Sequence, residues 1–191
     1  VEHSGGRAEV DSLAVRDGVW TCLAALARAA DELGGRVRSL ALSVSGNEAT
    51  AVDVAGAPVA RTVSSMDVRG GDVIEKWREK VSEAELYAIT GLPLHVMHPL
   101  MRLLWMRDEE PEAAAACARF LCWGDLLALW LGASPGIDHS TASCTMAFDI
   151  SARQWSGRLL ELADVSTDVF GEPVPTGTPI GTVASAVAVE L

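Results

Sequence analysis

The chain has 191 residues, of which 49% are hydrophobic, and its 15 basic and 26 acidic residues give a net charge of −11. This excess of negative charge disfavours binding to nucleic acids and to anionic membrane surfaces. No apolar run reaches the roughly 18 residues that a membrane-spanning helix needs. We therefore expect neither partner, and the length and apolar content predict a single folded domain over residues 1–191.

The four cysteines, Cys22, Cys117, Cys122 and Cys144, contain no C-x-x-C pair, which removes support for zinc or thioredoxin-type chemistry. The first residues lack the pattern of a signal peptide. Scattered cysteines in such a chain predict reduced thiols and a cytoplasmic location, with a Cys117–Cys122 disulfide as the alternative. Because the chain opens on Val1, we expect its natural start to lie upstream or to have been removed.

The first 70 residues predict a helix followed by strands. Residues 1–12 are expected to form a loop. Apolar residues at helical spacing predict a helix over 19–33, ended by Gly34 and Gly35. Alternation of polar and apolar residues predicts a strand over 38–45, and two more strands within 49–63 are expected to form a hairpin.

The chain is mostly helical after Gly70 and Gly71. The predicted helices span 72–82, 83–89, 99–107, 111–116, 126–131 (with Asp125 as its N-cap), 140–146 and 155–163, and strands are predicted over 119–123 and 181–188. The pattern indicates an α/β fold with a strand-rich part at 1–70, a helical part at 71–165 and a return to the sheet, or a tail, at 166–191. So few strands are unusual for an α/β core of this size, so we expect an incomplete sheet.

Two segments carry a recognisable order of motifs. Thr90–Gly91 is followed by a proline-containing loop and a helix ending in Leu104–Trp105. Further along stand Gly124–Leu127, Asp138 with Ser140–Ser143, Phe148–Asp149 and Trp155. Together they resemble the N-terminal domain of the FGGY carbohydrate kinases, including xylulokinases and glycerol kinases. The amino-acid sequence of residues 90–107 is most similar to that of gluconate kinases.

Shorter matches extend the resemblance upstream. Gly6–Asp11 resembles the family's Gly-Trp-x-Glu-Gln-Asp with Arg7 in place of Trp, and Met66–Arg69 resembles its Asn-Asp-Gly-Arg. The resemblance implies the first lobe of a ribonuclease H-like (actin-like ATPase) fold, a mixed sheet with a helical insertion, incomplete at both ends. The family's Asp-x-Gly-Thr-Thr phosphate loop and its Gly-Gly-x-Asp segment are absent from these residues, and Gly5–Gly6 and Gly70–Gly71 are interpreted as ordinary loop glycines.

The resemblance also suggests the residues that contact a sugar. Asn47 and Glu48 follow the predicted strand 38–45, where α/β sheets bind ligands, and Ser65 stands where many relatives carry Trp. Asp67, with Arg69 beside it, offers groups for hydroxyls or a sugar carboxylate. The alternatives are a hydrophilic turn at 47–48 and an exposed salt-bridged turn at 67–69.

Met97 and His98 align with a loop that faces the substrate in the family, and packing beneath the following helix is the alternative. His95 and His98 lack a third ligand, so no metal site is expected. We interpret Asp125 and Asp138 as structural, and the six tryptophans mostly as core.

The resemblance implies that the parent protein is a kinase that uses ATP and Mg²⁺ to phosphorylate a sugar, polyol or sugar acid. Gluconate is the first choice of substrate, and a pentulose such as xylulose is the second. The general-base Asp is expected outside this chain, which alone would be inactive and hold no cofactor. A homodimer is an open alternative, and so is a non-catalytic remnant that serves as a binding or assembly module.

Overall fold

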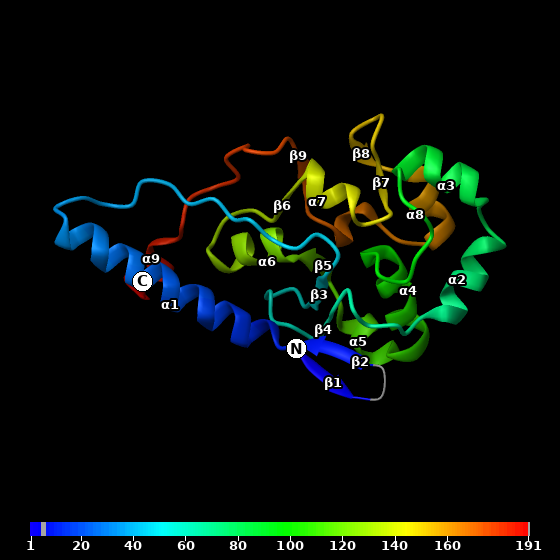
Figure 1. Ribbon diagram of the computed structural model, residues 1–191, viewed down its shortest axis with the longest axis horizontal. Coiled ribbons are helices and arrows are strands. Elements are labelled where there is room, and N and C mark those ends of the chain that lie inside the picture. The colour runs from blue at the N-terminus through cyan, green and yellow to red at the C-terminus, as the bar shows by residue number, and fades with distance from the viewer. Residues whose placement is uncertain (5–6, 191) are drawn as a thin grey trace.

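The computed structural model describes residues 1–4 and 7–190, in which short strands form small sheets between helices (Figure 1). The strands are β1 (Glu2–Ser4), β2 (Arg7–Val10), β3 (Ala49–Val52), β4 (Thr62–Val63), β5 (Arg119–Cys122), β6 (Gly136–Asp138), β7 (Phe148–Asp149), β8 (Gln154–Trp155) and β9 (Glu172–Val174). The helices are α1 (Ser12–Glu32), α2 (Gly71–Arg78), α3 (Glu83–Thr90), α4 (Pro99–Glu109), α5 (Pro111–Ala116), α6 (Trp123–Trp130), α7 (His139–Ser143), α8 (Gly157–Ala163) and α9 (Ser185–Glu190), with a 3₁₀ turn, η1, at Thr167–Val169. The predicted mixture of helices and strands is confirmed.

The strands pair over long sequence separations. β2 lies between β1 and β4, antiparallel to both, and β3 is antiparallel to β5 with Ala49 opposite Cys122. β6 and β9 are parallel, while β7 and β8 are antiparallel. The buried hydroxyls of Thr50 and Thr62 lie 2.5 Å apart and join β3 to β4. This contact brings the turn after β4 to the start of β3, where the predicted sugar residues stand.

Helix α1 begins at Ser12 rather than at residue 19. The Asp11 carboxylate accepts hydrogen bonds from the amides of Leu13 and Ala14, which makes Asp11 the N-cap. Gly34, with a φ of 68°, ends the helix in the left-handed conformation that the sequence predicts. Asp17 and Gly18, which precede the predicted helix 19–33, lie inside α1.

The predicted strand at 38–45 does not form. This segment runs back alongside α1 in an extended path (Figure 1), and within the described residues positions 36–48 make no backbone–backbone hydrogen bond. Leu40 and Leu42 remain 40% and 36% exposed. Alternation of polar and apolar residues predicts a segment with two different faces, but a strand also needs a neighbouring strand that pairs with its backbone.

Three other expectations are wrong. Residues 1–12 contribute strands β1 and β2 rather than only a loop, apart from Gly5 and Gly6, which lie outside the described residues. The segment 181–188 ends in helix α9, and the late strand is β9 instead. The turn inside 49–63 is present, with a bridge between Val52 and Pro58, but β3 and β4 belong to different sheets.

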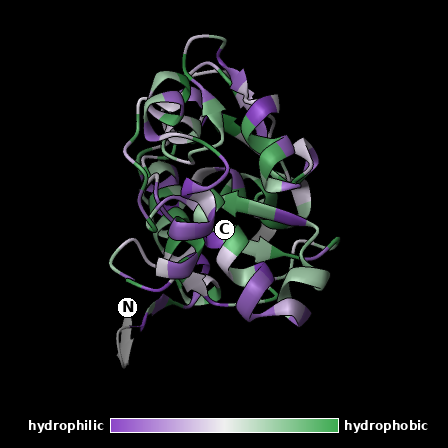
Figure 2. Cartoon of the chain, turned by 90° about the vertical axis from the view of Figure 1, so that its right-hand side faces the viewer, coloured by the Kyte–Doolittle hydropathy of each residue, from purple (hydrophilic) through white to green (hydrophobic). Residues whose placement is uncertain are grey.

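The core lies between α2, α3, α4, α8 and the short sheets, and includes Trp77, Leu86 and Leu100, each at most 1% exposed. A smaller cluster holds Val52, Leu121, Trp123 and Leu126. Green and purple residues alternate along the helices in Figure 2, as amphipathic helices around a core require. Of the six tryptophans, 77, 105 and 123 are buried and 20, 130 and 155 are partly buried, in agreement with the core interpretation.

Candidate functional site

The loop at Ser45–Glu48 lies tightly against the end of α7. A Cβ atom added to Gly46 would stand 2.9 Å from the Cys144 sulfur and 3.2 Å from its Cβ. Only a residue without a side chain fits at that separation. The closeness fixes where Asn47 and Glu48, both half-buried, leave the loop and enter β3.

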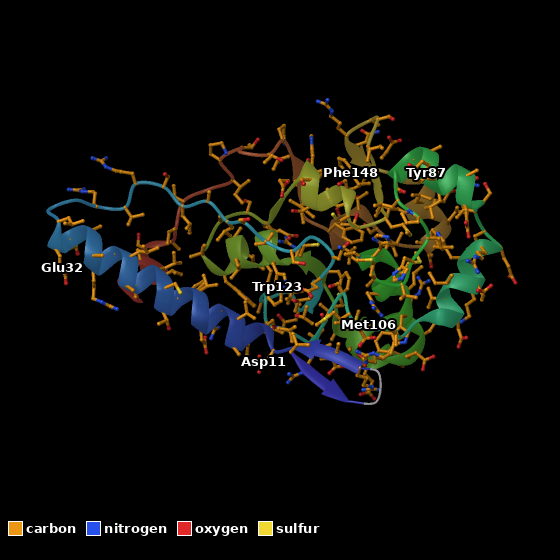
Figure 3. All side chains as sticks on the ribbon, in the orientation of Figure 1. Asp11, Glu32, Tyr87, Met106, Trp123 and Phe148 are labelled. Atoms are coloured by element: carbon orange, nitrogen blue, oxygen red, sulfur yellow. The ribbon has the colours of Figure 1, made fainter. Side chains whose placement is uncertain are left out.

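The Glu48 carboxylate is held by three donors. Its Oε1 accepts from the Ser64 hydroxyl at 3.1 Å and from the Ser65 amide at 3.2 Å, and its Oε2 accepts from Trp123 Nε1 at 2.8 Å. Because Ala49 is opposite Cys122 in the β3–β5 ladder, the register places Glu48 beside Trp123. Figure 3 shows Trp123 in the middle of the molecule, at the start of α6. Two predicted sugar residues, Glu48 and Ser65, therefore meet directly.

Asp67 is buried, at 1% exposure, and already has several partners. It accepts from the Ala8 amide at 2.8 Å and from the amide and Nε of Arg69 at 2.9 Å, and its carboxylate lies 3.4 Å from Arg102 Nη1. Burial by itself raises the pKa of Asp67, but the hydrogen bonds from Arg69 and Ala8 outweigh it and lower that pKa below 3.8. The predicted salt-bridged turn exists, but its carboxylate is not exposed.

The two arginines complete this cluster. Arg69 Nη2 lies 2.8 Å from Glu9, and its guanidinium stands 4.6 Å from the Trp105 ring. Arg102, 3% exposed, donates to the carbonyls of Asp67 and Arg69. Burial lowers the pKa of Arg102 to about 10, which still leaves it charged at neutral pH. Paired charges thus tie the turn after β4 to α4 and to β2.

His98 is the N-cap residue of α4 and is 4% exposed. Its Nδ1 lies 3.0 Å from the Cys144 carbonyl and its Nε2 3.2 Å from the Pro93 carbonyl. Burial lowers the pKa of His98 below 6.5. Both ring nitrogens face protein carbonyls, so His98 connects α4 to the same residue, Cys144, on which Gly46 packs. Met97 precedes it and is half-buried.

Asp125 is not an N-cap. It lies inside α6, whose N-cap position belongs to Cys122, and it is 1% exposed. Neither carboxylate oxygen has a hydrogen-bond partner among the described residues. Burial raises the pKa of Asp125 well above its ordinary value. Asp138 is the N-cap of α7, accepting from the amides of Ser140 and Thr141, which confirms its predicted structural role.

The described part of the chain contains no group of three His, Cys, Asp or Glu residues arranged to hold a metal ion. None of its helices combines the length and hydrophobicity required to cross a bilayer. All four cysteines are free, so the Cys117–Cys122 disulfide is wrong. A groove of about 610 Å³ between α4, α5 and residues 164–169 does not include the predicted sugar residues.

Comparison with known proteins places these residues in a family. The model of the FGGY family of carbohydrate kinases, N-terminal domain, matches residues 2–191. A gluconokinase of Bacillus subtilis (strain 168) is 26% identical over 141 residues, which is 74% of this chain and 28% of that protein. An autoinducer-2 kinase of Enterobacter sp. (strain 638) is 31% identical over 106 residues, 56% of this chain and 20% of that protein.

The same architecture occurs in solved structures. The xylulose kinase from Rhodospirillum rubrum superposes with a TM-score of 0.89 at 22% identity, covering 100% of this chain and 40% of that chain. The matched part of the chain covers less than a third of the length of the gluconokinase and the autoinducer-2 kinase. The chain belongs to the FGGY family of carbohydrate kinases, and its fold is the ribonuclease H-like, actin-like ATPase lobe that the sequence resemblance implies.

Sequence reasoning missed Trp123 and Cys144 as parts of this region. The apolar surroundings of Trp123 predict a core residue, and it is buried, but its indole N–H also donates to the Glu48 carboxylate. The sequence does not distinguish Cys144 from the other scattered thiols, whereas in the structure Gly46 and His98 both contact it. A signal for Trp123 existed in its position at the end of the predicted strand 119–123, but the sequence does not show which strand pairs with it.

Proposed function

We propose that the protein to which this chain belongs phosphorylates a small carbohydrate, and that this chain supplies part of the wall that binds it. The observation that carries the proposal is the Glu48 carboxylate, which three donors orient at the end of a loop. An oriented carboxylate accepts hydrogen bonds from sugar hydroxyls. Phosphoryl transfer depends mainly on positioning, which such a fixed group supports.

We assign the six predicted site residues two kinds of role. Asn47, Glu48, Ser65 and Met97 are half-buried and are proposed to line the sugar pocket. Asp67 and His98 are buried and have protein partners, so we propose that they position the turn at 64–67 and the loop at 97–98. In this division the two buried residues act on the sugar only through the segments that they hold.

ATP and Mg²⁺ are proposed as the cofactors of the parent protein. The described residues do not fit them, because Asp67 and Asp138 are occupied by protein donors and Asp125 is buried inside α6. Gly70 caps the short helix α2 and lies against Trp105, so it does not form a phosphate loop between a strand and a helix. We propose that this domain, 1–191, is one part of a first lobe, with the general base elsewhere.

Gluconate is proposed as the first substrate to test and a pentulose such as xylulose as the second. The amino-acid sequence of residues 90–107 and the relative named gluconokinase support gluconate. The structural neighbour named xylulose kinase supports the pentulose, and the relatives named autoinducer-2 kinase add a third candidate. A cytoplasmic location and a homodimeric assembly are proposed with them.

The test is an ADP-release assay on the protein as its source produces it, with gluconate, xylulose and glycerol as acceptors. We expect sugar-dependent ADP release by that protein and none by the 191-residue chain alone. Turnover by the isolated chain would show that the catalytic parts have been misplaced. A native protein of this length with no turnover would favour the second candidate, a non-catalytic binding module.

A further inference from the structure

We propose that helix α1 packs against α1 of a second copy of this chain, antiparallel and centred near Cys22. The inference gives the proposed homodimer its interface, so it rests on that part of the proposed function. It does not depend on the reaction that the protein catalyses.

Helix α1 is poorly covered by the rest of the chain. Figure 1 shows it at the opposite end of the molecule from α2 and α3. Of its 21 residues, all of which the structure describes, only Ser12 is buried. Residues 18–27 contain no charged side chain, although a helix at a protein surface typically carries charged and polar residues on its outer face. The outer face of α1 is therefore unusual for a surface in contact with water.

The exposed side of α1 presents one continuous uncharged face. Leu26 is 60% exposed, and Leu33, the C-cap residue, is 88% exposed. At about 100° per residue, the exposed small and aliphatic residues fall within about 120° of the helix circumference. They are Ala14, Gly18, Cys22, Ala25, Leu26, Ala29 and Leu33. Half-buried residues such as Val19 and Leu23 occupy the neighbouring arc, which faces the chain. A contiguous exposed face of this kind indicates a contact with another protein surface.

The charges at the edge of this face favour a second copy in the antiparallel orientation. Asp17 and Arg28 are exposed and lie on the same edge of the face, about 8 Å before and about 9 Å after Cys22 along the helix axis. A two-fold axis near Cys22 places Asp17 beside the partner's Arg28, and it does so twice by symmetry. Parallel packing in register would instead set like charges side by side. Arg16 contacts Asp17 at 2.8 Å, but the Asp17 side chain is 68% exposed and can accept a second donor.

The sizes of the side chains suit this arrangement. Leu26 and Gly18 each stand four residues from Cys22, so the two-fold axis sets each leucine over the partner's glycine. Small residues at a helix contact let the two axes approach to about 8 Å. One pair of helices about 30 Å long is smaller than the interface of a permanent dimer. We therefore expect a reversible dimer with a Kd in about the micromolar range, in which Cys22 remains accessible to reagents through the monomer.

The experiment measures dimerisation of the native protein and its variants by sedimentation velocity, from about 1 to about 100 µM. Leu26→Glu places a charge in the face and keeps a residue that favours a helix. The matched control is Tyr87→Glu, because Tyr87 is 62% exposed and lies on α3, far from the end of α1 at Glu32 (Figure 3). Arg28→Asp and Asp17→Arg are measured singly and together.

A second measurement tests the position of the two-fold axis. Copper–phenanthroline oxidises two thiols to a disulfide only where the two Cα atoms come within about 7 Å. Cys22 is exposed in the chain, and the proposed axis brings it beside the partner's Cys22. Cys22→Ser is the control for cross-links through other cysteines, and mass spectrometry of the digested product identifies the joined peptides.

We expect Leu26→Glu to raise the Kd of the dimer about tenfold or more and Tyr87→Glu to leave it unchanged. Each single charge reversal should weaken the dimer, the double variant should recover most of the loss, and oxidation should join Cys22 to Cys22. A dimer that Leu26→Glu leaves intact, that the double charge reversal does not restore or that forms no Cys22 cross-link overturns this interface while the homodimer stands. A native protein that stays monomeric overturns both, and the ADP-release assay still decides the kinase function separately.

Discussion

Replacing Asp67 by alanine removes the carboxylate that joins the turn after β4 to two arginines. Asp67 is 1% exposed and lies against Arg69 and Arg102, which are themselves largely buried. Loss of one member of a buried ion pair leaves an uncompensated charge and costs about 3–5 kcal/mol. For a chain of this length, that corresponds to a fall in melting temperature of about 6–20 °C.

The assay is urea unfolding followed by tryptophan fluorescence, with Asp67→Asn as the milder variant and Asp108→Ala as the control. Asp108 pairs at 2.7 Å with Lys76 on the surface, where ion pairs contribute little. We expect a large loss for Asp67→Ala, a smaller one for Asp67→Asn and almost none for Asp108→Ala. Equal effects of Asp67→Ala and Asp108→Ala would refute the reasoning.

The native protein and Asp67→Asn also allow a test of the pKa of Asp67 by pH-dependent unfolding. The pKa of Asp67 is lower in the folded chain than its ordinary value of 3.8. Folded protein therefore binds fewer protons at this group, and its stabilising effect is complete above pH 3.8 and is lost as the pH falls through the lowered pKa. The stability difference between native protein and Asp67→Asn should shrink in that acid range. A difference that stays constant to pH 2 would contradict the assignment.

Three further outcomes are expected. Gly46→Ala should destabilise the chain by about 1–3 kcal/mol, because the new Cβ atom would meet Cys144. In a double-mutant cycle measured by thermal unfolding, Cys144→Ala should recover part of that loss. Strict additivity of the two effects would argue against the contact. At pH 8, Cys22, which is exposed, should react with a thiol reagent in seconds, whereas Cys122, whose pKa burial raises, should react only as the chain unfolds. Burial holds the pKa of His98 below 6.5, so the stability that depends on neutral His98 is complete above pH 6.5 and decreases as the pH falls below that value. His98→Gln should flatten the dependence of the unfolding free energy on pH in this range.

Local periodicity and end signals determined several parts of this protein from the sequence alone. The helices at 71–78, 83–90, 99–109 and 111–116 follow from apolar spacing, and the last two also from a proline in their first turn. These signals act within a few residues of one another. The capping roles of Asp138 and Gly34 were also predictable, because a cap acts on the backbone of the helix beside it in the sequence. The order of short motifs was sufficient to indicate the family.

Contacts between distant residues were decided only by the tertiary structure. Residues 38–45 have the alternation of a strand, yet a strand forms only where another backbone pairs with it. Asp125 has the residue type of a helix cap, but its position inside α6 buries it. Trp123 and Glu48 are 75 residues apart, and only the antiparallel register of β3 and β5 brings the indole N–H to the carboxylate. Sequence spacing holds no information about that register, because each pairing depends on where the rest of the chain packs.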